Sequence, residues 1–169
     1  MRMTNEDHSP DPAGGAFWRF SLDVYGRPGV AAACLELQDR HGCDVNLVLF
    51  ALWVGASGRG RLRDADLSAL DGATASWRRA VIAPLRALRR QVKREADAAL
   101  LYEALKAAEL EAEHILQSRL EALAPPVTVA AAGRRADALA NLRASLGSGS
   151  AFESAAPLRV QLGAIVAVG

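Results

Sequence analysis

The sequence predicts an all-α protein, an irregular bundle of five or six helices with a long helical hairpin and a mobile C-terminal tail. Alanine is abundant and β-branched residues are scarce, in a chain that is 51% hydrophobic and 23% charged. Apolar residues recur every three or four positions over most of the length, as they do along the buried face of a helix. The 169 residues favour one helical domain at 16–124, between a disordered lead of residues 1–15 and a mostly flexible Ala-, Gly- and Ser-rich tail of residues 125–169.

The first helix is expected over residues 16–25, and we expect it to be heavily buried. Its apolar side chains form one stripe at spacings of four and three, widened on one side: Trp18, Leu22 and Tyr25, with Phe17, Phe20 and Val24. Such a stripe is typical of a helix that packs on a core. Gly26 can adopt a positive φ and end this helix.

The next two helices are marked by their end signals. Val30, Cys34, Leu37 and His41 share one face of a second helix, and Gly42 stands where a left-handed C-terminal cap is wanted. Asp44 follows as an N-cap, because its carboxylate can accept the free backbone N–H groups of the next turn. The third helix, residues 45–54, is apolar on nearly every side and should lie at the centre of the core beside the aromatic first helix.

A glycine- and arginine-rich break separates these helices from a second group. Asp64 or Asp66 is expected to cap a short helix that ends near Asp71 and Gly72. Thr74 then caps an amphipathic helix, in which Pro84 predicts a kink or a broken turn.

Charge is strongly segregated between the two long segments that follow. Residues 74–94 carry seven basic and no acidic side chains, whereas residues 95–123 carry seven acidic and two basic ones. We interpret the pair as an antiparallel hairpin that turns near Glu95 to Ala98, with opposite charges facing each other. One long helix is the alternative, because neither Gly nor Pro marks the turn. After Pro125 the chain is predicted to be mobile, although the terminal apolar segment, residues 162–168, could instead dock as a strand or helix on the domain or on a partner.

Composition restricts the class of function only weakly. The net charge of +1 gives no overall attraction to nucleic acid or lipid, and the apolar run at 45–54 is too short to cross a bilayer. The N-terminal residues lack the apolar stretch of a secretory signal, so we expect a cytoplasmic protein whose Cys34 and Cys43 stay reduced. Oligomeric state is not indicated.

No catalytic residue or cofactor is assigned, because phosphate-binding, nucleophile-elbow and zinc motifs do not occur. Glu111 and His114 have the Glu-x-x-His spacing of di-iron ligands, but such a site needs two such pairs. We therefore expect a solvated acidic face and no metal.

The binding candidates fall in two groups. Polar residues near the start of the third helix form the first: Gln38, Asp39, Asp44 and Asn46, with Trp53 one helix length on. The basic face supplies the second: Arg86, Arg89 and Arg90. The leading hypothesis is a non-enzymatic protein-interaction or adaptor module, with its partner surface on the basic helix or at the Trp18 and Tyr25 end, since segregated charge favours recognition of a charged partner. The alternatives are a small-molecule- or metal-dependent enzyme with a pocket near Asp39, Asp44, Asn46 and Trp53, and a nucleic-acid binder using Arg78 to Arg94.

The densest run of unusual residues carries a resemblance. It consists of Phe17-Trp18, Ser21, Tyr25, Gly29-Val30, Ala33-Cys34-Leu35, Leu37-Gln38-Asp39, Gly42, Asp44-Val45-Asn46, Leu49-Phe50 and Trp53. This pattern resembles a small, mainly proteobacterial family of helical proteins, known as a conserved domain of unknown function. The similarity continues more loosely through Trp77-Arg78 and Leu101-Tyr102-Glu103 to about Leu123. It implies an all-helical cytosolic bacterial protein and brings no known reaction.

Overall fold

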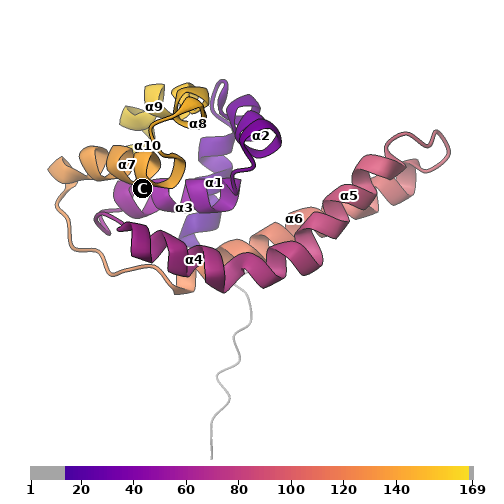
Figure 1. Ribbon diagram of the computed structural model, residues 1–169, viewed down its shortest axis with the longest axis horizontal. Helices are drawn as coiled ribbons and strands as arrows, with labels where there is room; N and C mark the ends of the chain where they lie inside the picture. Colours follow the sequence, from indigo (N-terminus) through magenta and orange to yellow (C-terminus); the bar gives the residue numbers. More distant parts are fainter. Residues whose placement is uncertain (1–13, 168–169) are drawn as a thin grey trace, which may run out of the picture.

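The computed structural model describes residues 14–167, and within that range the chain is helical with no strand (Figure 1). The helices follow one another as α1 (Ala16–Tyr25), α2 (Val30–His41), α3 (Val45–Ala56), α4 (Asp64–Trp77), a π-helical segment η1 (Arg78–Ile82), α5 (Ala83–Val92), α6 (Ala99–Ala122), α7 (Ala131–Leu146), α8 (Ser150–Ser154), α9 (Ala156–Val160) and α10 (Leu162–Val166). The all-α class is confirmed. Most of the expected disordered lead, residues 1–13, lies outside the described residues.

The hydrophobic α3 lies at the centre of the bundle, as its sequence predicts. From Val48 to Ala56 every residue of α3 is buried. Its neighbour α1 inserts Phe17, which packs edge-on against Phe50 and stacks on Trp53, with centroids 5.3 Å away in both cases. Aromatic pairs at this separation add to the free energy of area burial. The predicted packing of the aromatic first helix beside the third is therefore confirmed.

The ends of the helices around the core follow their local signals, with one correction. Asp44 caps α3, since its Oδ1 accepts the backbone N–H of Asn46 at 2.9 Å. Gly42 closes α2 in the left-handed region, with φ of 64°. Gly26, however, has a φ of −73°, so our prediction of a positive φ at this residue is wrong. Gly29 takes the left-handed conformation instead and begins α2.

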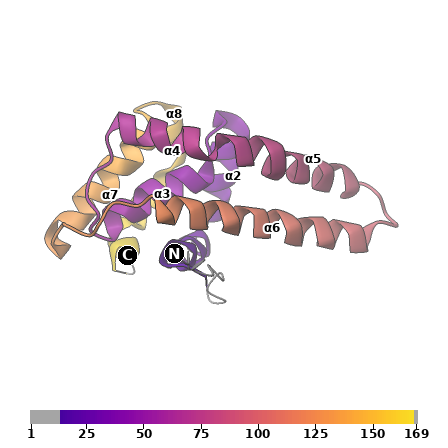
Figure 2. The same cartoon turned by 90° about the horizontal axis from the view of Figure 1, so that it is seen from below.

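The predicted hairpin is present and projects from the body as an arm (Figures 1 and 2). The first side of the arm is α5, and α6 returns antiparallel to it after a turn at residues 93–98. Backbone hydrogen bonds stabilise this turn; in one of them the N–H of Ala98 donates to the carbonyl of Glu95. Residues 74–122 thus form a hairpin rather than one long helix.

The helix that leads into the arm is longer than the sequence suggests. No break occurs at Asp71 and Gly72, because Thr74 does not cap a new helix: its hydroxyl donates to the Leu70 carbonyl at 2.9 Å inside α4. The expected disturbance at Pro84 is instead a wide π turn, in which the N–H of Ala83 donates to the Arg78 carbonyl five residues earlier. Proline lacks an N–H and its ring crowds the preceding turn, which a wider turn relieves.

The segment after Pro125 corrects our expectation of a mobile tail. Residues 131–166 form α7 to α10, and α7 packs along α3 with Ala138 and Leu142 fully buried. Asn141 is also buried, where it accepts the N–H of Leu62 at 2.8 Å and donates to the Gly60 carbonyl at 2.9 Å. The apolar end docks on the domain through Leu162 and Ile165, in line with the alternative prediction for this segment. Small side chains let α7 approach α3 closely, so low hydrophobicity here reflects tight packing and not disorder.

Within the described residues, no helix combines the length and the apolar character that spanning a bilayer requires.

Candidate functional site

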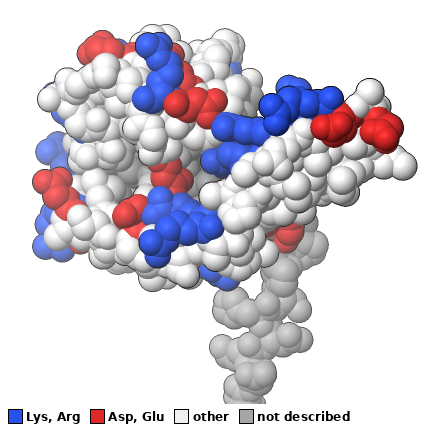
Figure 3. Space-filling view, turned by 45° about the vertical axis from the view of Figure 1, so that its right-hand side comes forward, with Lys and Arg blue, Asp and Glu red and all other residues white. Residues whose placement is uncertain are grey.

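A pocket of about 700 Å³ opens where the arm joins the body. Its walls come from α1, α2, the start of α3, the η1–α5 junction and α6. Figure 3 looks onto a face that is hollowed between the rounded body and the projecting arm, with basic and acidic side chains around the hollow. A volume of this size lies within the range of small-molecule sites in proteins.

The predicted stripe of α1 forms part of this pocket rather than of the core. Trp18, Leu22 and Tyr25 line the pocket, and Leu22 and Tyr25 are 53% and 39% exposed. The buried face of α1 is the one formed by Phe17, Phe20 and Val24. The expectation that the whole stripe is buried is therefore wrong. Leu35 and Leu110, also exposed, extend the apolar wall from α2 and α6.

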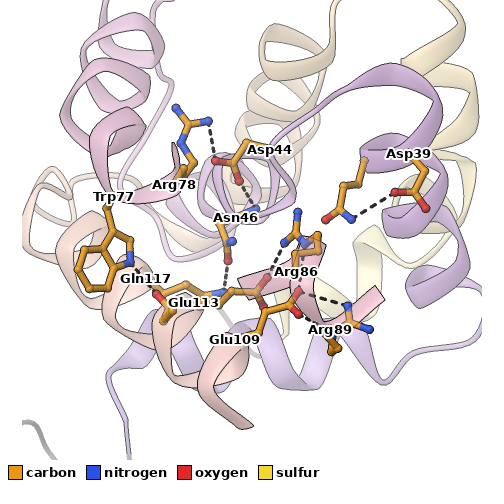
Figure 4. A network of polar contacts seen from close by, with 12 residues as sticks. Asp39, Asp44, Asn46, Trp77, Arg78, Arg86, Arg89, Glu109, Glu113 and Gln117 are labelled. Atoms are coloured by element: carbon orange, nitrogen blue, oxygen red, sulfur yellow. Dashed lines mark hydrogen bonds and ion pairs between the residues drawn. The ribbon is translucent and has the colours of Figure 1, made fainter. Parts of the chain in front are cut away.

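Polar side chains also line the pocket, and Figure 4 shows how several of them contact one another. Asp44 pairs with Arg78, whose Nη1 lies 2.8 Å from Oδ2, and Arg78 also contacts Asp71. Asn46, 9% exposed, accepts a hydrogen bond from Nε2 of Gln117 at 2.8 Å. This buried amide pair fixes how the start of α3 meets α6.

A second ion-pair group connects the two helices of the arm. Arg86 donates to Oε1 of Glu109 at 3.0 Å and to Oε1 of Glu113 at 2.8 Å, and Arg89 donates to Oε2 of Glu109. The Glu109 residue is 8% exposed, so these partners are what makes its charge tolerable there. Burial raises the pKa of Glu109, but the hydrogen bonds from Arg89 and Arg86 outweigh that effect and hold it below its ordinary value.

Other ionisable groups at the pocket have pKa values above their ordinary values. Burial raises the pKa of Glu113, and the neighbouring carboxylates of Glu109 and Asp44 add to that rise against the influence of Arg86. Burial likewise raises the pKa of the Tyr25 hydroxyl. The Cys34 thiol reaches a pKa of about 12 for the same reason, so it is protonated at neutral pH and unreactive. Cys34 and Cys43 are both free.

Four buried side-chain atoms of the pocket residues form no hydrogen bond in the part of the chain that the structure describes: Oγ of Ser21, Oδ2 of Asp44, Nε of Arg78 and Oε1 of Gln117. The Asp44 oxygen still has its ion pair with Arg78, which leaves three atoms without a polar partner. Ser21 and Gln117 are 3% and 4% exposed. Leaving a buried polar atom unpaired costs about 1–3 kcal/mol, so three of them around one pocket need an explanation.

The structure brings some of the predicted binding residues together and separates the others. Gln38, Asp44, Asn46 and Arg86 line the pocket. Arg89 does not line the pocket, and its guanidinium donates a hydrogen bond to Glu109, as that of Arg86 does. The pair of Asp39 and Arg90 lies on the exposed surface, with 2.8 Å between Oδ1 and Nη2, and this hydrogen bond lowers the pKa of Asp39.

The remaining sequence candidates lie elsewhere. Trp53, 2% exposed, belongs to the core and is not among the pocket residues. Glu111 is mostly solvent-exposed and lies 3.8 Å from His114. The ring of His114 packs at a tilt against Trp18, with 4.5 Å between the centroids. Over residues 14–167 the acidic, histidine and cysteine side chains form no group of three or more that could hold a metal ion.

Sequence reasoning did not select three of the polar residues that line the pocket as binding candidates. They are Ser21 on α1 and, four positions apart on α6, Glu113 and Gln117. Arg78 was predicted only as part of a basic nucleic-acid-binding face and not as the partner of Asp44.

Loss of Glu109 is expected to destabilise the arm strongly. Glu109→Ala leaves Arg86 and Arg89, each about one quarter exposed, without their shared carboxylate, and we expect the free energy of unfolding to fall by about 3 kcal/mol. Glu103→Ala is the matched control on the same helix, because its pair with Lys106 is well exposed. This control should change the free energy by less than about 0.5 kcal/mol in urea titrations.

The same Glu109 contribution should depend on pH. A carboxyl group whose pKa is lower in the folded state stabilises the fold above the ordinary glutamate pKa and loses that effect as the pH falls through the folded value. The difference between wild type and Glu109→Ala should therefore persist at neutral pH and shrink in acid. A difference that is constant down to pH of about 2 would contradict the ion-pair explanation.

The fold and the site together define an all-α protein with a polar-walled pocket at the base of a helical hairpin. A family model described as "Protein of unknown function (DUF2390)" matches residues 16–120, well over half of the chain. The chain therefore belongs to this family, which confirms the resemblance to a domain of unknown function. No curated protein and no solved structure matches it. Every residue lining the pocket lies inside the family segment, whereas α7 to α10 lie outside it.

Proposed function

We propose that this protein binds a small organic molecule, with an apolar body and a polar end, in the pocket between the body and the arm. The observation that carries this proposal is the pocket itself, about 700 Å³ in volume, which combines an apolar wall with the polar side chains of Gln38, Arg86 and Glu113. The polar end of a ligand can form hydrogen bonds with these side chains. The exposed apolar side chains Leu22, Leu35 and Leu110 can then cover its apolar body.

The proposal modifies the hypothesis of a protein-interaction module. That hypothesis placed the partner surface on the basic face or at the Trp18 and Tyr25 end of the first helix. The basic face is less suited to this role because Arg86, Arg89 and Arg90 are each engaged by a carboxylate of the same chain, and Trp18 and Tyr25 line the pocket. Paired charges attract a macromolecular partner less than free ones, which also weakens the support for nucleic-acid binding. A binding protein is preferred to an enzyme because no pocket residue pairs a nucleophile with a base; the Cys34 thiol stays protonated. We further propose a bacterial cytosolic location, which rests on the sequence resemblance.

The test uses a neutral dye whose fluorescence rises in apolar surroundings, Nile red. A ligand of about 24 non-hydrogen atoms at roughly −0.3 kcal/mol per atom should bind with a Kd on the order of 5 µM. Ala83→Trp fills the pocket from the η1–α5 junction, because Ala83 is exposed and lines it. We expect this variant to lose the fluorescence increase.

The matched control is Ala87→Trp, one turn further along α5, at an exposed position that does not line the pocket. It adds the same side chain and should bind the dye as the wild type does. Equal fluorescence with both variants would place the dye elsewhere and refute the proposal. Absence of any increase with the wild-type protein would refute it as well.

A further inference from the structure

The charged side chains that line the pocket balance one another. Two are acidic, Asp44 and Glu113, and two are basic, Arg78 and Arg86. They form two ion pairs, Asp44 with Arg78 and Glu113 with Arg86, with 2.8 Å between the paired atoms in each. Two further carboxylates contact these arginines from outside the pocket, those of Asp71 and Glu109. A charged ligand would add an unpaired charge to this partly buried set, whereas an uncharged ligand leaves both ion pairs as they are.

We propose that the polar end of the ligand is an uncharged amide group, whose carbonyl oxygen accepts a hydrogen bond from Arg86 and whose N–H donates one to Glu113. This inference rests on the proposed function and specifies the chemical class of its ligand.

The polar atoms that a ligand can reach include both donors and acceptors. Several side-chain atoms of the pocket residues make no hydrogen bond within residues 14–167 and are not enclosed by protein atoms. The donors are Nη1 of Arg86, Nδ2 of Asn46 and Nε1 of Trp18, and the acceptors are Oε2 of Glu113 and Oε1 of Gln38. The Tyr25 hydroxyl can serve as either. An ammonium group only donates and a carboxylate only accepts, so each would leave part of this set without a partner.

Arg78 does not decide the chemistry of the ligand, although its Nε donor makes no hydrogen bond in the described part of the chain. Its Nη1 and Nη2 atoms are held by Asp44 and Asp71, and Nε is enclosed by protein atoms. Oγ of Ser21 and Oε1 of Gln117 are enclosed in the same way. A ligand cannot reach these three atoms unless the side chains around them move.

Arg86 and Glu113 present a donor beside an acceptor (Figure 4). Nη2 of Arg86 donates to Oε1 of Glu113 at 2.8 Å, so the free Nη1 and Oε2 atoms each share a carbon with one atom of this contact. An amide also carries its oxygen and its nitrogen on one carbon, as an acceptor beside a donor. Hydrogen bonds with ionised side chains are stronger than those between neutral groups. The apolar part of the ligand can meanwhile pack on Leu22 and Leu35.

The experiment compares four probes of nearly equal size: benzamide, which has a donor and an acceptor, acetophenone, which has only the acceptor, benzylamine, which is a cation, and benzoate, which is an anion. Each competes with Nile red for the wild-type protein. Burial raises the pKa of Glu113, so the measurement is made at pH 8, well above the ordinary glutamate pKa of about 4.3.

We expect benzamide to displace the dye at about one tenth of the concentration that acetophenone needs, and the two ions to be weaker than benzamide. A ranking led by benzylamine or benzoate would overturn this inference. It would also be overturned if acetophenone were as effective as benzamide, or if benzamide displaced no dye.

Two variants locate the acceptor that is responsible. Glu113→Gln keeps an oxygen for Arg86 but turns an N–H group instead of an oxygen toward the ligand. The advantage of benzamide over acetophenone should then disappear, and benzoate should bind more tightly, because the charged groups that line the pocket no longer balance. Glu111→Gln, at an exposed position of the same helix, should leave the ranking unchanged.

Dye binding by the variants shows that they are folded. If Glu113→Gln keeps the full preference for benzamide, the amide does not bind at Glu113 and the inference is wrong. A wild-type protein that binds no dye contradicts the proposed function, whereas normal dye binding with another ranking of the probes contradicts only the amide ligand.

Discussion

A chain that ends at Pro126 is expected not to fold, although it keeps the whole of the family segment. Without α7 and α10 the central helix α3 loses its cover, and Ala138, Leu142 and Ile165, all fully buried, are removed from the core. Asn141 also disappears, which leaves the N–H of Leu62 and the carbonyl of Gly60 without partners. Full burial of an aliphatic side chain contributes about 1.5–3 kcal/mol, so the loss of these side chains is comparable with the 5–15 kcal/mol that stabilises an ordinary domain.

Circular dichroism and thermal unfolding of the shortened chain measure this outcome. The loss of a cooperative transition is expected. If the shortened chain kept the helical content of α1 to α6 and unfolded cooperatively at the midpoint of the full-length protein, α7 to α10 would be dispensable.

Two point variants in the full chain separate packing from truncation. Leu142→Ala, at a fully buried site, should lower the free energy of unfolding by about 2–5 kcal/mol. Leu139→Ala lies on the same helix at a 36% exposed site and should cost well under half as much.

Gly55→Ala is expected to lower the free energy of unfolding by about 3 kcal/mol, a large effect for one methyl group. A Cβ at this position of α3 would lie 2.3 Å from the backbone nitrogen of Ala138 and 2.4 Å from its Cα. Both are backbone atoms of α7, so the clash cannot be relieved by a side-chain rotation. The two helices must move apart, which loosens the packing along their length.

The control for this substitution is Gly72→Ala, because Gly72 also lies inside a helix but has no atom within 4 Å of the added Cβ. Its backbone φ is compatible with alanine, so the change should raise stability by about 0.5–1 kcal/mol through lower flexibility of the unfolded chain. Urea unfolding of both variants checks the opposite signs. A Gly55→Ala protein as stable as wild type would mean that α7 does not approach α3 so closely.

Local chemistry made much of the fold predictable. Asp44 caps α3 and Gly42 ends α2 because each effect depends on atoms within a few residues. The hairpin could be predicted from segregated charge, and its turn at residues 93–98 lies where that charge changes sign. The predictions failed where local signals were ambiguous: Gly72 and Thr74 suggested a helix boundary, but α4 continues through both because its hydrogen bonds remain intact.

The candidate site was only partly predictable. Asn46 attracted attention because an amide stands inside an apolar helix, and its partner proves to be Gln117, 71 positions away in the sequence. Gln117 itself sits on an ordinary amphipathic helix, where a polar residue needs no explanation. The pocket exists only because α1, α2, α3, α5 and α6 converge, and nothing in the sequence reports that convergence.

The sequence by itself determined the helical class, most helix boundaries, the caps and the hairpin, because these depend on contacts between near neighbours along the chain. The tertiary structure decided which side of α1 is buried, since apolar residues cover more than half of that helix and periodicity cannot choose between Phe17 and Trp18. It also decided that the Ala- and Gly-rich segment after Pro125 joins the core. Small residues make weak signals in a sequence, yet they let helices such as α3 and α7 approach closely, and that approach is visible only when both helices are present.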